Sequence, residues 1–289
     1  MPRCIKDYIK RCIPDRLFLK LMYRKCMGKK LNLKNPQTFN EKLQWLKLYN
    51  RKTEYTKMVD KYEAKKYVAE KIGEEYIIPT LGVWNSFDEI DFDALPCQFV
   101  LKCTHDSGGL VIVKDKSNFD KKEACKKITR CLKRNYFWQN REWPYKNVRP
   151  RIIAEKYMED SVCHELTDYK FYCFNGKPEF ILVATERASL DGVKMDFFDM
   201  DFNHLEMKWG HSNSKKTIVK PKSFDKIINF AEKLSKGIPL CRCDFYEVNG
   251  KPYFGEITFF PASGMEAFEP EGWDKILGDW IKLPVRPIK

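Results

Sequence analysis

The chain has 289 residues, of which 43% are hydrophobic and 32% are charged, as is typical of folded globular proteins and not of disordered ones. No stretch approaches the roughly 18 consecutive apolar residues that a membrane-spanning helix needs, and the charged N-terminus lacks the apolar core of a signal peptide. We therefore expect a cytoplasmic protein.

Positive charge is concentrated at the N-terminus. The net charge is +13, and residues 1–61, with 17 basic and 5 acidic side chains, carry +12 of it. Such a segment attracts an anionic membrane surface, a polyanionic glycan or nucleic acid. No nucleic-acid-binding motif accompanies it, so we do not expect nucleic acid as a partner. The alternative is that these lysines and arginines are solvated residues on helix surfaces.

The 11 cysteines predict neither disulfides nor a metal cluster. They are scattered, odd in number and include no pair with the spacing C-x-x-C. Cys241 and Cys243 could supply two zinc ligands, but no second pair accompanies them. Several others lie in apolar runs, where a thiol packs as a small hydrophobic group. We expect reduced thiols.

The first elements along the chain are helices, and residues 1–58 are expected to be largely helical. Thr38 and Glu41 form a capping-box pattern at the start of a helix over Phe39–Tyr49. A second helix is expected over Asp60–Ile72, because its apolar residues recur at helical spacing and a glycine follows it.

From residue 76 onward, extended segments and tight turns predominate. Asn-Gly pairs favour the tight turns of β-hairpins and occur at Asn175–Gly176 and Asn249–Gly250. Expected strands cover Tyr76–Val83, Phe99–Cys103, Leu110–Val113, Arg151–Ala154 and Met195–Phe202, and expected helices run from Asp120 to Arg134 and over Phe224–Ser235. This order predicts an α+β fold with antiparallel hairpins in the C-terminal half.

The first candidate site follows the strand Phe99–Cys103. Lys102 lies at the end of this apolar strand, where burying an ammonium group is costly unless an anion meets it. Ser107, Gly108 and Gly109 follow, and their backbone N–H groups could receive phosphate oxygens. Either the segment binds phosphate, or it is a hairpin whose lysine reaches solvent.

The second candidate is the segment Arg151–Met158. A buried strand here runs into Glu155 and then into Tyr157 and Met158. Backbone groups at the strand edge could form hydrogen bonds with an adenine base while Tyr157 or Met158 packs beside it. Taken alone, the segment is better explained as a strand that ends in charged residues.

The third candidate is a pair of carboxylates on two expected strands. Asp244 and Glu256 offer hard oxygen ligands for magnesium, and Thr258 shares the face of Glu256 because side chains alternate along a strand. Arg242 shares the face of Asp244 and could stabilise phosphoryl charge. The alternative is that these are solvated charges on exposed strands.

The two carboxylates share a face only if the hairpin between them is irregular. With a two-residue turn at Asn249–Gly250, Asp244 would face Gly255, and Glu256 would point to the opposite side. We therefore expect either an odd-numbered loop, for instance Asn249–Lys251, or a β-bulge.

The order of these motifs resembles the ATP-grasp superfamily, and more narrowly the TupA-like ATP-grasp family, which is named for teichuronopeptide biosynthesis. The segments that carry the resemblance are Pro36–Leu43, Asp60–Tyr62, Ile78–Gly82, Lys102–Gly109, Arg141–Tyr145, Glu155–Met158 and Asp244–Gly264. The resemblance implies two α+β lobes whose antiparallel sheets clasp ATP. The implied domains are a basic helical segment over residues 1–58 and an ATP-grasp domain over residues 59–289, with a lid subdomain at about 97–155.

The resemblance also implies ATP and Mg²⁺ as cofactors and assigns roles to residues. Those implied to bind ATP are Lys102, Thr104, Ser107, Gly108, Gly109, Glu155, Lys156, Tyr157, Met158, Asp168 and Lys170. Asp244, Glu256 and Thr258 would bind magnesium, and Arg242 with Lys102 would be catalytic. Typical members have asparagine where this chain has Thr258, and a dinucleotide-binding-like domain where this chain has its basic segment.

The implied reaction converts a carboxylate to an acyl phosphate at the expense of ATP, and an amine then attacks to form an amide. The expected partners are an anionic glycan or lipid-linked sugar of a bacterial surface polysaccharide, together with an amino acid or other amine donor. The basic residues 1–61 would contact this glycan or the inner face of the membrane. Rival hypotheses are an ATP-grasp-fold kinase, a nucleotide-sugar glycosyltransferase suggested by Asp196 and Asp199, and a glycan-binding module without activity.

Overall fold

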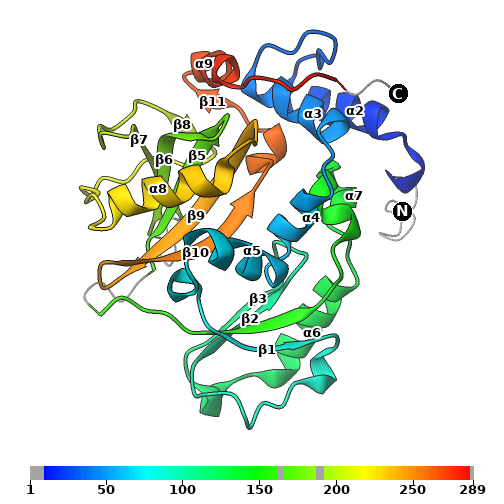
Figure 1. Cartoon of the computed structure of the whole chain (residues 1–289). Helices are drawn as coiled ribbons and strands as arrows, with labels where there is room; N and C mark the ends of the chain where they lie inside the picture. Colours follow the sequence, from blue (N-terminus) through cyan, green and yellow to red (C-terminus); the bar gives the residue numbers. More distant parts are fainter. Residues whose placement is uncertain (1–9, 162–165, 187–191, 287–289) are drawn as a thin grey trace. The chain divides into compact units, whose positions relative to one another are not determined.

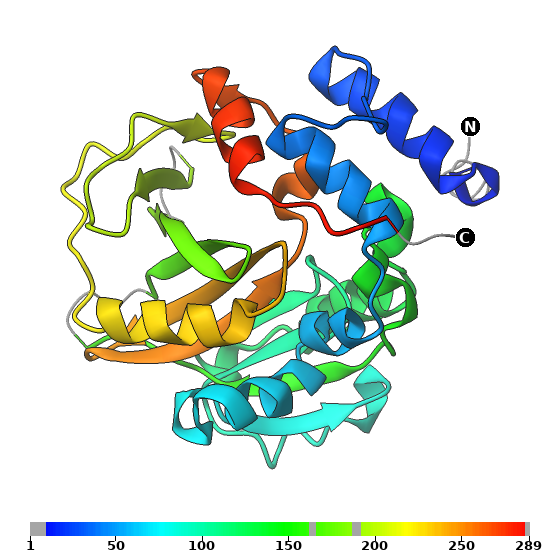
Figure 2. The same cartoon turned by 45° about the horizontal axis from the view of Figure 1, so that its top comes forward.

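The computed structural model describes residues 10–161, 166–186 and 192–286, and the chain divides into two compact units. One unit consists of Met1–Arg51 together with Leu166–Lys289, and the other of Lys52–Glu165. Their elements are coloured along the chain in Figures 1 and 2. In the part of the chain that the structure describes, no helix is both long enough and apolar enough to cross a membrane.

The Lys52–Glu165 unit is built around a four-stranded antiparallel sheet in the order β1-β4-β2-β3 (Figure 1). Its strands are β1 (Thr80–Trp84), β2 (Phe99–Cys103), β3 (Leu110–Val113) and β4 (Ile152–Lys156). Its helices are α4 (Glu54–Val59), α5 (Glu63–Ile72), α6 (Lys121–Leu132) and α7 (Phe137–Asn140), with 3-10 turns at Glu74–Tyr76, Phe87–Glu89, Lys116–Asn118 and Trp143–Asn147. The buried side of α6 packs against the apolar face of β2 and β4, which forms the core of this unit.

The other unit is built around a five-stranded antiparallel sheet in the order β10-β9-β5-β6-β7. Its strands are β5 (Asp168–Phe174), β6 (Lys177–Thr185), β7 (Lys194–Phe198), β9 (Leu240–Val248) and β10 (Lys251–Thr258), beside a small pair formed by β8 (Lys208–Trp209) and β11 (Phe268–Glu269). Its helices are α2 (Asp15–Met27), α3 (Phe39–Tyr49), α8 (Phe224–Ser235) and α9 (Gly272–Trp280), with a 3-10 turn at Pro261–Gly264. α8 covers one face of the sheet through Phe224 and Phe230, whose rings meet Phe171 and Phe245.

The α+β prediction is confirmed, and local signals placed several elements correctly. Thr38 and Glu41 form the predicted capping box, since the Thr38 side chain accepts from the Glu41 backbone N–H and the Glu41 carboxylate accepts from the Thr38 N–H. The turns at Asn175–Gly176 and Asn249–Gly250 join β5 to β6 and β9 to β10, and all four turn residues have positive φ. Asparagine and glycine tolerate this left-handed conformation better than other residues, which is why the pair marks such turns.

Several expected boundaries were wrong by a few residues, among them the end of the helix expected to reach Arg134, which ends at Leu132. The helix expected from Asp60 begins at Glu63, because the Asp60 carboxylate accepts from the backbone N–H groups of Tyr62 and Glu63 at the start of the helix. The extended run expected from Tyr76 starts at Thr80, after a 3-10 turn. The strand expected to reach Phe202 ends at Phe198, and the strand expected over Arg151–Ala154 runs from Ile152 to Lys156. The last shift places Glu155 inside β4, directly opposite Val100 of β2.

Candidate functional site

Within the Lys52–Glu165 unit, Lys102, Glu155 and Lys65 form a buried ion-pair cluster. Val100 of β2 lies directly opposite Glu155 of β4, so Lys102, two residues along β2, projects from the same face as Glu155. The Lys102 Nζ atom lies 2.5 Å from Glu155 Oε2, and the Lys65 Nζ atom of α5 lies 2.6 Å from Glu155 Oε1. The glutamate therefore holds two ammonium groups on one carboxylate.

Electrostatics keep this carboxylate charged. Burial by itself would raise the pKa of Glu155, but the ammonium groups of Lys102 and Lys65 outweigh burial and lower the pKa below its usual value. Burial in turn lowers the pKa of Lys65. A cluster with two cations and one anion has a spare positive charge that an anionic ligand could meet.

Lys65 is a member of this cluster that we did not single out from the sequence. Within its helix it lies one position after the buried Ala64, among several other lysines. Its Nζ atom also donates to the carbonyl oxygen of Ile78 at 2.5 Å. Helical periodicity separates apolar from polar positions, but it does not distinguish a lysine that pairs with a distant buried carboxylate from one that faces water.

The loop Thr104–Gly109 is fixed by its own contacts. The Thr104 hydroxyl donates to the carbonyl oxygen of Arg149 at 3.3 Å, and the buried Asp106 forms an ion pair with Arg134 and accepts from the Ser107 N–H at 2.8 Å. A Cβ atom added at Gly109 would lie 2.6 Å from the Cys103 sulfur, so glycine is required for this close approach. The loop joins β2 to β3 with little room for side chains.

In the other unit, six polar side chains share one face of three adjacent strands. Lys170 of β5 lies opposite Asp244 of β9, which lies opposite Glu256 of β10. Because side chains alternate between the two faces of a strand, the residue two positions along each strand projects from the same face. The complete group is Asp168 and Lys170 on β5, Arg242 and Asp244 on β9, and Glu256 and Thr258 on β10.

Asp244 is the centre of this polar face. Arg242 contacts it with two nitrogens, Nε to Oδ1 and Nη2 to Oδ2, each at 2.6 Å. Lys170 donates to Asp244 Oδ2 at 2.7 Å and to Asp168 Oδ2 at 2.5 Å. Burial would raise the pKa of Asp244, but Arg242 and Lys170 outweigh burial and lower the pKa, so the carboxylate stays ionised.

Arg242 also links the two outer members of the polar face. Its Nη2 atom lies 3.2 Å from Glu256 Oε1 and 3.1 Å from the Thr258 hydroxyl, which in turn lies 3.3 Å from Glu256 Oε1. Two carboxylates and a hydroxyl on neighbouring strands supply the hard oxygen donors that magnesium prefers. The residues present therefore fit a magnesium site by donor type, with the guanidinium between the carboxylates available to contact phosphoryl oxygens.

The predicted irregularity of the hairpin is confirmed, and it is a bulge. Phe254 pairs with Phe245, the register then shifts, and Glu256 pairs with Asp244. Gly255 is the extra residue, and an added Cβ there would lie 3.1 Å from the carbonyl oxygen of Asp244. The turn has only two residues, Asn249–Gly250, so the bulge alone brings both carboxylates to one face.

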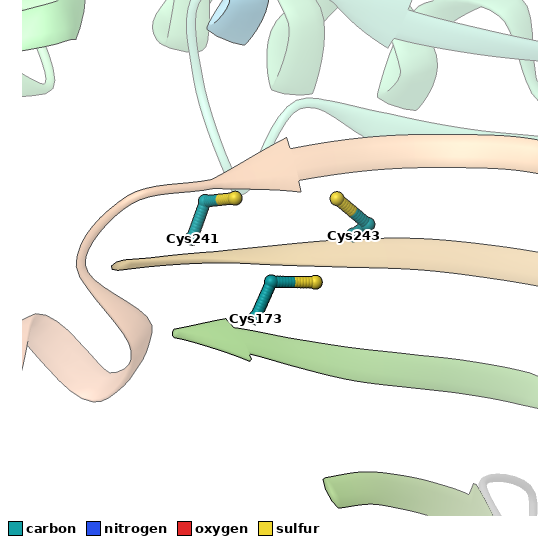
Figure 3. Close-up of side chains that lie close together, drawn as sticks. All are labelled: Cys173, Cys241 and Cys243. Carbon is teal, nitrogen blue, oxygen red and sulfur yellow. The ribbon is translucent and has the colours of Figure 1, made fainter. Parts of the chain in front are cut away.

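Three cysteines of β5 and β9 lie close together (Figure 3). The strand register places them on the face opposite the polar side chains, and Cys173 Sγ lies 3.9 Å from the carbonyl oxygen of Ala231 in α8. The sulfur atoms of Cys173, Cys241 and Cys243 all lie within 4.8 Å of one another, and all three side chains are buried. Hydrogen bonding to Cys173 and burial raise the pKa of Cys241 and Cys243, so these two thiols are protonated at neutral pH. The cysteines in the described part of the chain form no disulfides, as predicted. These three pack as part of the core.

The aspartates that suggested a nucleotide-sugar enzyme serve local structure. Asp196 accepts from the Ser214 backbone N–H at 3.0 Å and lies 3.2 Å from His204 Nε2. The Asp199 carboxylate accepts from the backbone N–H groups of Asp201 and Asn203, which close the turn after β7. This arrangement gives the glycosyltransferase hypothesis no support.

Comparison with known proteins identifies the family of this chain. A family model described as TupA-like ATPgrasp matches residues 41–282. No curated protein matches the chain at a significant level. The chain is similar to a D-alanine–D-alanine ligase from Bacillus anthracis complexed with ATP (17% identity, 78% of this chain and 63% of that one, TM-score 0.43). It is also similar to an L-amino acid ligase from Bacillus licheniformis (12% identity, 95% and 66%, TM-score 0.48). The chain thus spans about three fifths to two thirds of these proteins.

Proposed function

This chain belongs to the TupA-like ATP-grasp family, and from that membership we propose that it is an ATP- and magnesium-dependent carboxylate–amine ligase. In the proposed reaction a carboxylate oxygen attacks the γ-phosphorus of ATP, ADP leaves, and an acyl phosphate results. An amine then attacks the acyl carbon, an amide forms, and inorganic phosphate leaves as the amine loses its proton. The observation that carries the proposal is the ionised Asp244 beside Glu256, with Arg242 bound to both.

On the nucleotide side, the proposed ligands lie in the Lys52–Glu165 unit. Lys102 would bind α- or β-phosphate oxygens, and Lys65 would keep Glu155 paired when Lys102 turns to the nucleotide. Glu155 would accept from the amino group of adenine. The remaining proposed contacts are Lys156, Tyr157 and Met158 for the base, and Thr104, Ser107, Gly108 and Gly109 for the triphosphate.

On the metal side, the proposed ligands lie on the polar face of β5, β9 and β10. Asp244, Glu256 and Thr258 would hold Mg²⁺, whose charge offsets that of the triphosphate. Arg242 would donate to the oxygens of the migrating phosphoryl group, and a donor held in place by Asp244 needs little reorganisation during the reaction. Lys170, which Asp168 orients, would be a further phosphate or ribose contact.

The family and the charge distribution support a proposal about the substrates. We propose that the carboxylate belongs to a uronic acid or an amino acid of a bacterial surface polysaccharide, and that the amine comes from an amino acid or a similar donor. A lipid-linked acceptor would bring the reaction to the inner face of the membrane. The strongly basic residues 1–61 support an anionic partner of one of these kinds.

The test is a screen of uronates and amino acids, singly and in pairs, for magnesium-dependent release of ADP by the full chain. We expect release over many turnovers only when a carboxylate and an amine are both present, because without an amine the reaction stops at the acyl phosphate, and mass spectrometry should show an amide product and free phosphate. Asp244→Asn should reduce release by about 100-fold or more, as loss of a preorganised charge does in other active sites. Asp199→Asn, which changes a carboxylate that only closes a turn, is the matched control. A phosphorylated product would instead establish kinase chemistry.

A further inference from the structure

The outward face of α2 carries two leucines that the fold does not bury. In this helix Phe18, Leu19 and Tyr23 are buried, and α2 lies beside α3 in both views (Figures 1 and 2). Leu17 and Leu21, one turn apart, remain 50% and 55% exposed. A surface helix needs only one apolar side to pack onto its own fold. Leu17 and Leu21 form a second apolar strip, which is available to contact a partner.

Basic residues flank the two leucines on both sides. At 100° per residue, Arg16, Lys20 and Arg24 form a row along one side of the leucines, and Lys25 lies on the other side. All four are exposed. Between residues 10 and 30 the chain has eight basic residues and one acidic residue, Asp15, which is paired with Arg51 at 2.7 Å. The face is therefore apolar along its middle and cationic at its borders.

We infer that this face of α2 docks on an anionic phospholipid bilayer. In that position Leu17 and Leu21 would enter the boundary between headgroups and acyl chains, and the flanking side chains would extend to lipid phosphates. Electrostatic attraction alone would also suit a soluble polyanion, but exposed leucines between the charges gain free energy only where apolar surface is available. The inference rests on α2 alone and holds whichever reaction the protein catalyses.

The experiment measures co-sedimentation of the full chain with vesicles. Binding is expected with vesicles that contain phosphatidylglycerol, to be weak with pure phosphatidylcholine, and to fall as salt rises because surface charges are screened. Leu17→Ser with Leu21→Ser keeps every charge and should weaken binding by about tenfold or more. Lys20→Glu with Arg24→Glu keeps both leucines and should weaken it by at least as much.

Matched controls separate this face from general charge and hydrophobicity. Lys122→Glu with Arg130→Glu makes the same charge change on the exposed side of α6, and Val219→Ser with Ile276→Ser removes two other exposed apolar side chains. Both control variants should bind vesicles as the unaltered chain does. Because all substituted positions are exposed, the midpoint of thermal unfolding should stay within about 4 °C of that of the unaltered chain. A variant that unfolds at a lower temperature is replaced by its single substitutions.

Three outcomes would overturn the inference. One is equal binding to neutral and anionic vesicles, and another is binding to soluble anionic polysaccharide that exceeds vesicle binding and is unchanged by the leucine substitutions. The third is a concentration-dependent dimer that the leucine substitutions abolish, with no vesicle binding, which would make the face an interface between two copies of the chain. ADP release with small uronates and amino acids as substrates should be the same in the α2 variants, so failure of docking leaves the proposed ligase chemistry intact.

Discussion

Glu256 lies directly across the hairpin from Asp244 because a single extra residue, Gly255, shifts the register between them. Without this shift in register, Gly255 would lie opposite Asp244, and Glu256 would project towards the face that α8 covers. The same shift brings Thr258 opposite Arg242, so that one guanidinium contacts both carboxylates and the hydroxyl. The polar face therefore depends on a backbone irregularity as much as on its side chains.

Substituting the bulge residue should disturb this alignment. In Gly255→Ala the new Cβ would lie 3.1 Å from the Asp244 carbonyl oxygen and 3.2 Å from Tyr246 Cε2, so one strand must move. We expect a loss of about 1–3 kcal/mol in unfolding free energy and a fall in ADP release of up to about tenfold. Gly272→Ala, where a Cβ meets nothing within 4 Å, is the control for both measurements. If Gly255→Ala is destabilised but releases ADP at an unaltered rate, the bulge contributes to stability and not to the reaction.

Removing the second ammonium from Glu155 should weaken nucleotide binding. In Lys65→Met the carboxylate keeps Lys102 as its partner and holds it more firmly, so less of the Lys102 charge is available to phosphate. We expect ATP affinity to fall by about tenfold, an ordinary size for one charge-assisted contact, as measured by calorimetric titration. Lys66→Met changes the neighbouring exposed lysine of α5 and should leave affinity unchanged. Equal affinity in the two variants would contradict the proposed role.

His105 should make the protein less stable in mild acid. Burial lowers the pKa of His105 below its ordinary value of 6.5, and its Nδ1 atom is buried without a hydrogen-bond partner among the described residues. Below pH 6.5 the unfolded chain therefore binds a proton that the folded chain resists, and stability falls by up to about 1.4 kcal/mol per pH unit.

The measurement is urea unfolding from pH 8 down to pH 5 for the unaltered chain and for His105→Gln. The glutamine does not titrate, so the difference in unfolding free energy between the two proteins should change below pH 6.5 and be constant above it. A difference that does not vary with pH would show that the histidine has the same pKa in the folded and in the unfolded chain.

The capping box of α3 should contribute measurably to stability. In Thr38→Ala the Glu41 backbone N–H loses its acceptor, and the expected cost is about 1 kcal/mol of unfolding free energy. Thr53 precedes α4 and makes no such capping bond, so Thr53→Ala is the matched control and should cost less. Chemical denaturation gives the unfolding free energy of both variants. Equal losses of unfolding free energy would mean that the capping box adds nothing beyond ordinary threonine packing.

Local sequence signals were sufficient for most of the secondary structure. Helix α3, helix α8, strands β2 and β3 and both Asn-Gly turns begin and end where the sequence predicted. Each depends on interactions within a few residues, such as capping, helical periodicity or the left-handed turn conformation. At two of the displaced boundaries a side chain competes with the backbone: Asp60 at the start of α5 and Asp199 after β7.

The α+β character and the family could be predicted from the sequence alone. So could the alternation Cys241-Arg242-Cys243-Asp244, which assigns thiols to one face of β9 and charges to the other. It also limited the hairpin to two possible irregularities, an odd loop or a bulge. Only the tertiary structure decided that the irregularity is a bulge at Gly255, and that Lys65 reaches Glu155. Helix capping and periodicity depend on residues that are near neighbours in the sequence, so they can be predicted from it. Strand register and buried ion pairs depend on distant segments that only folding brings together.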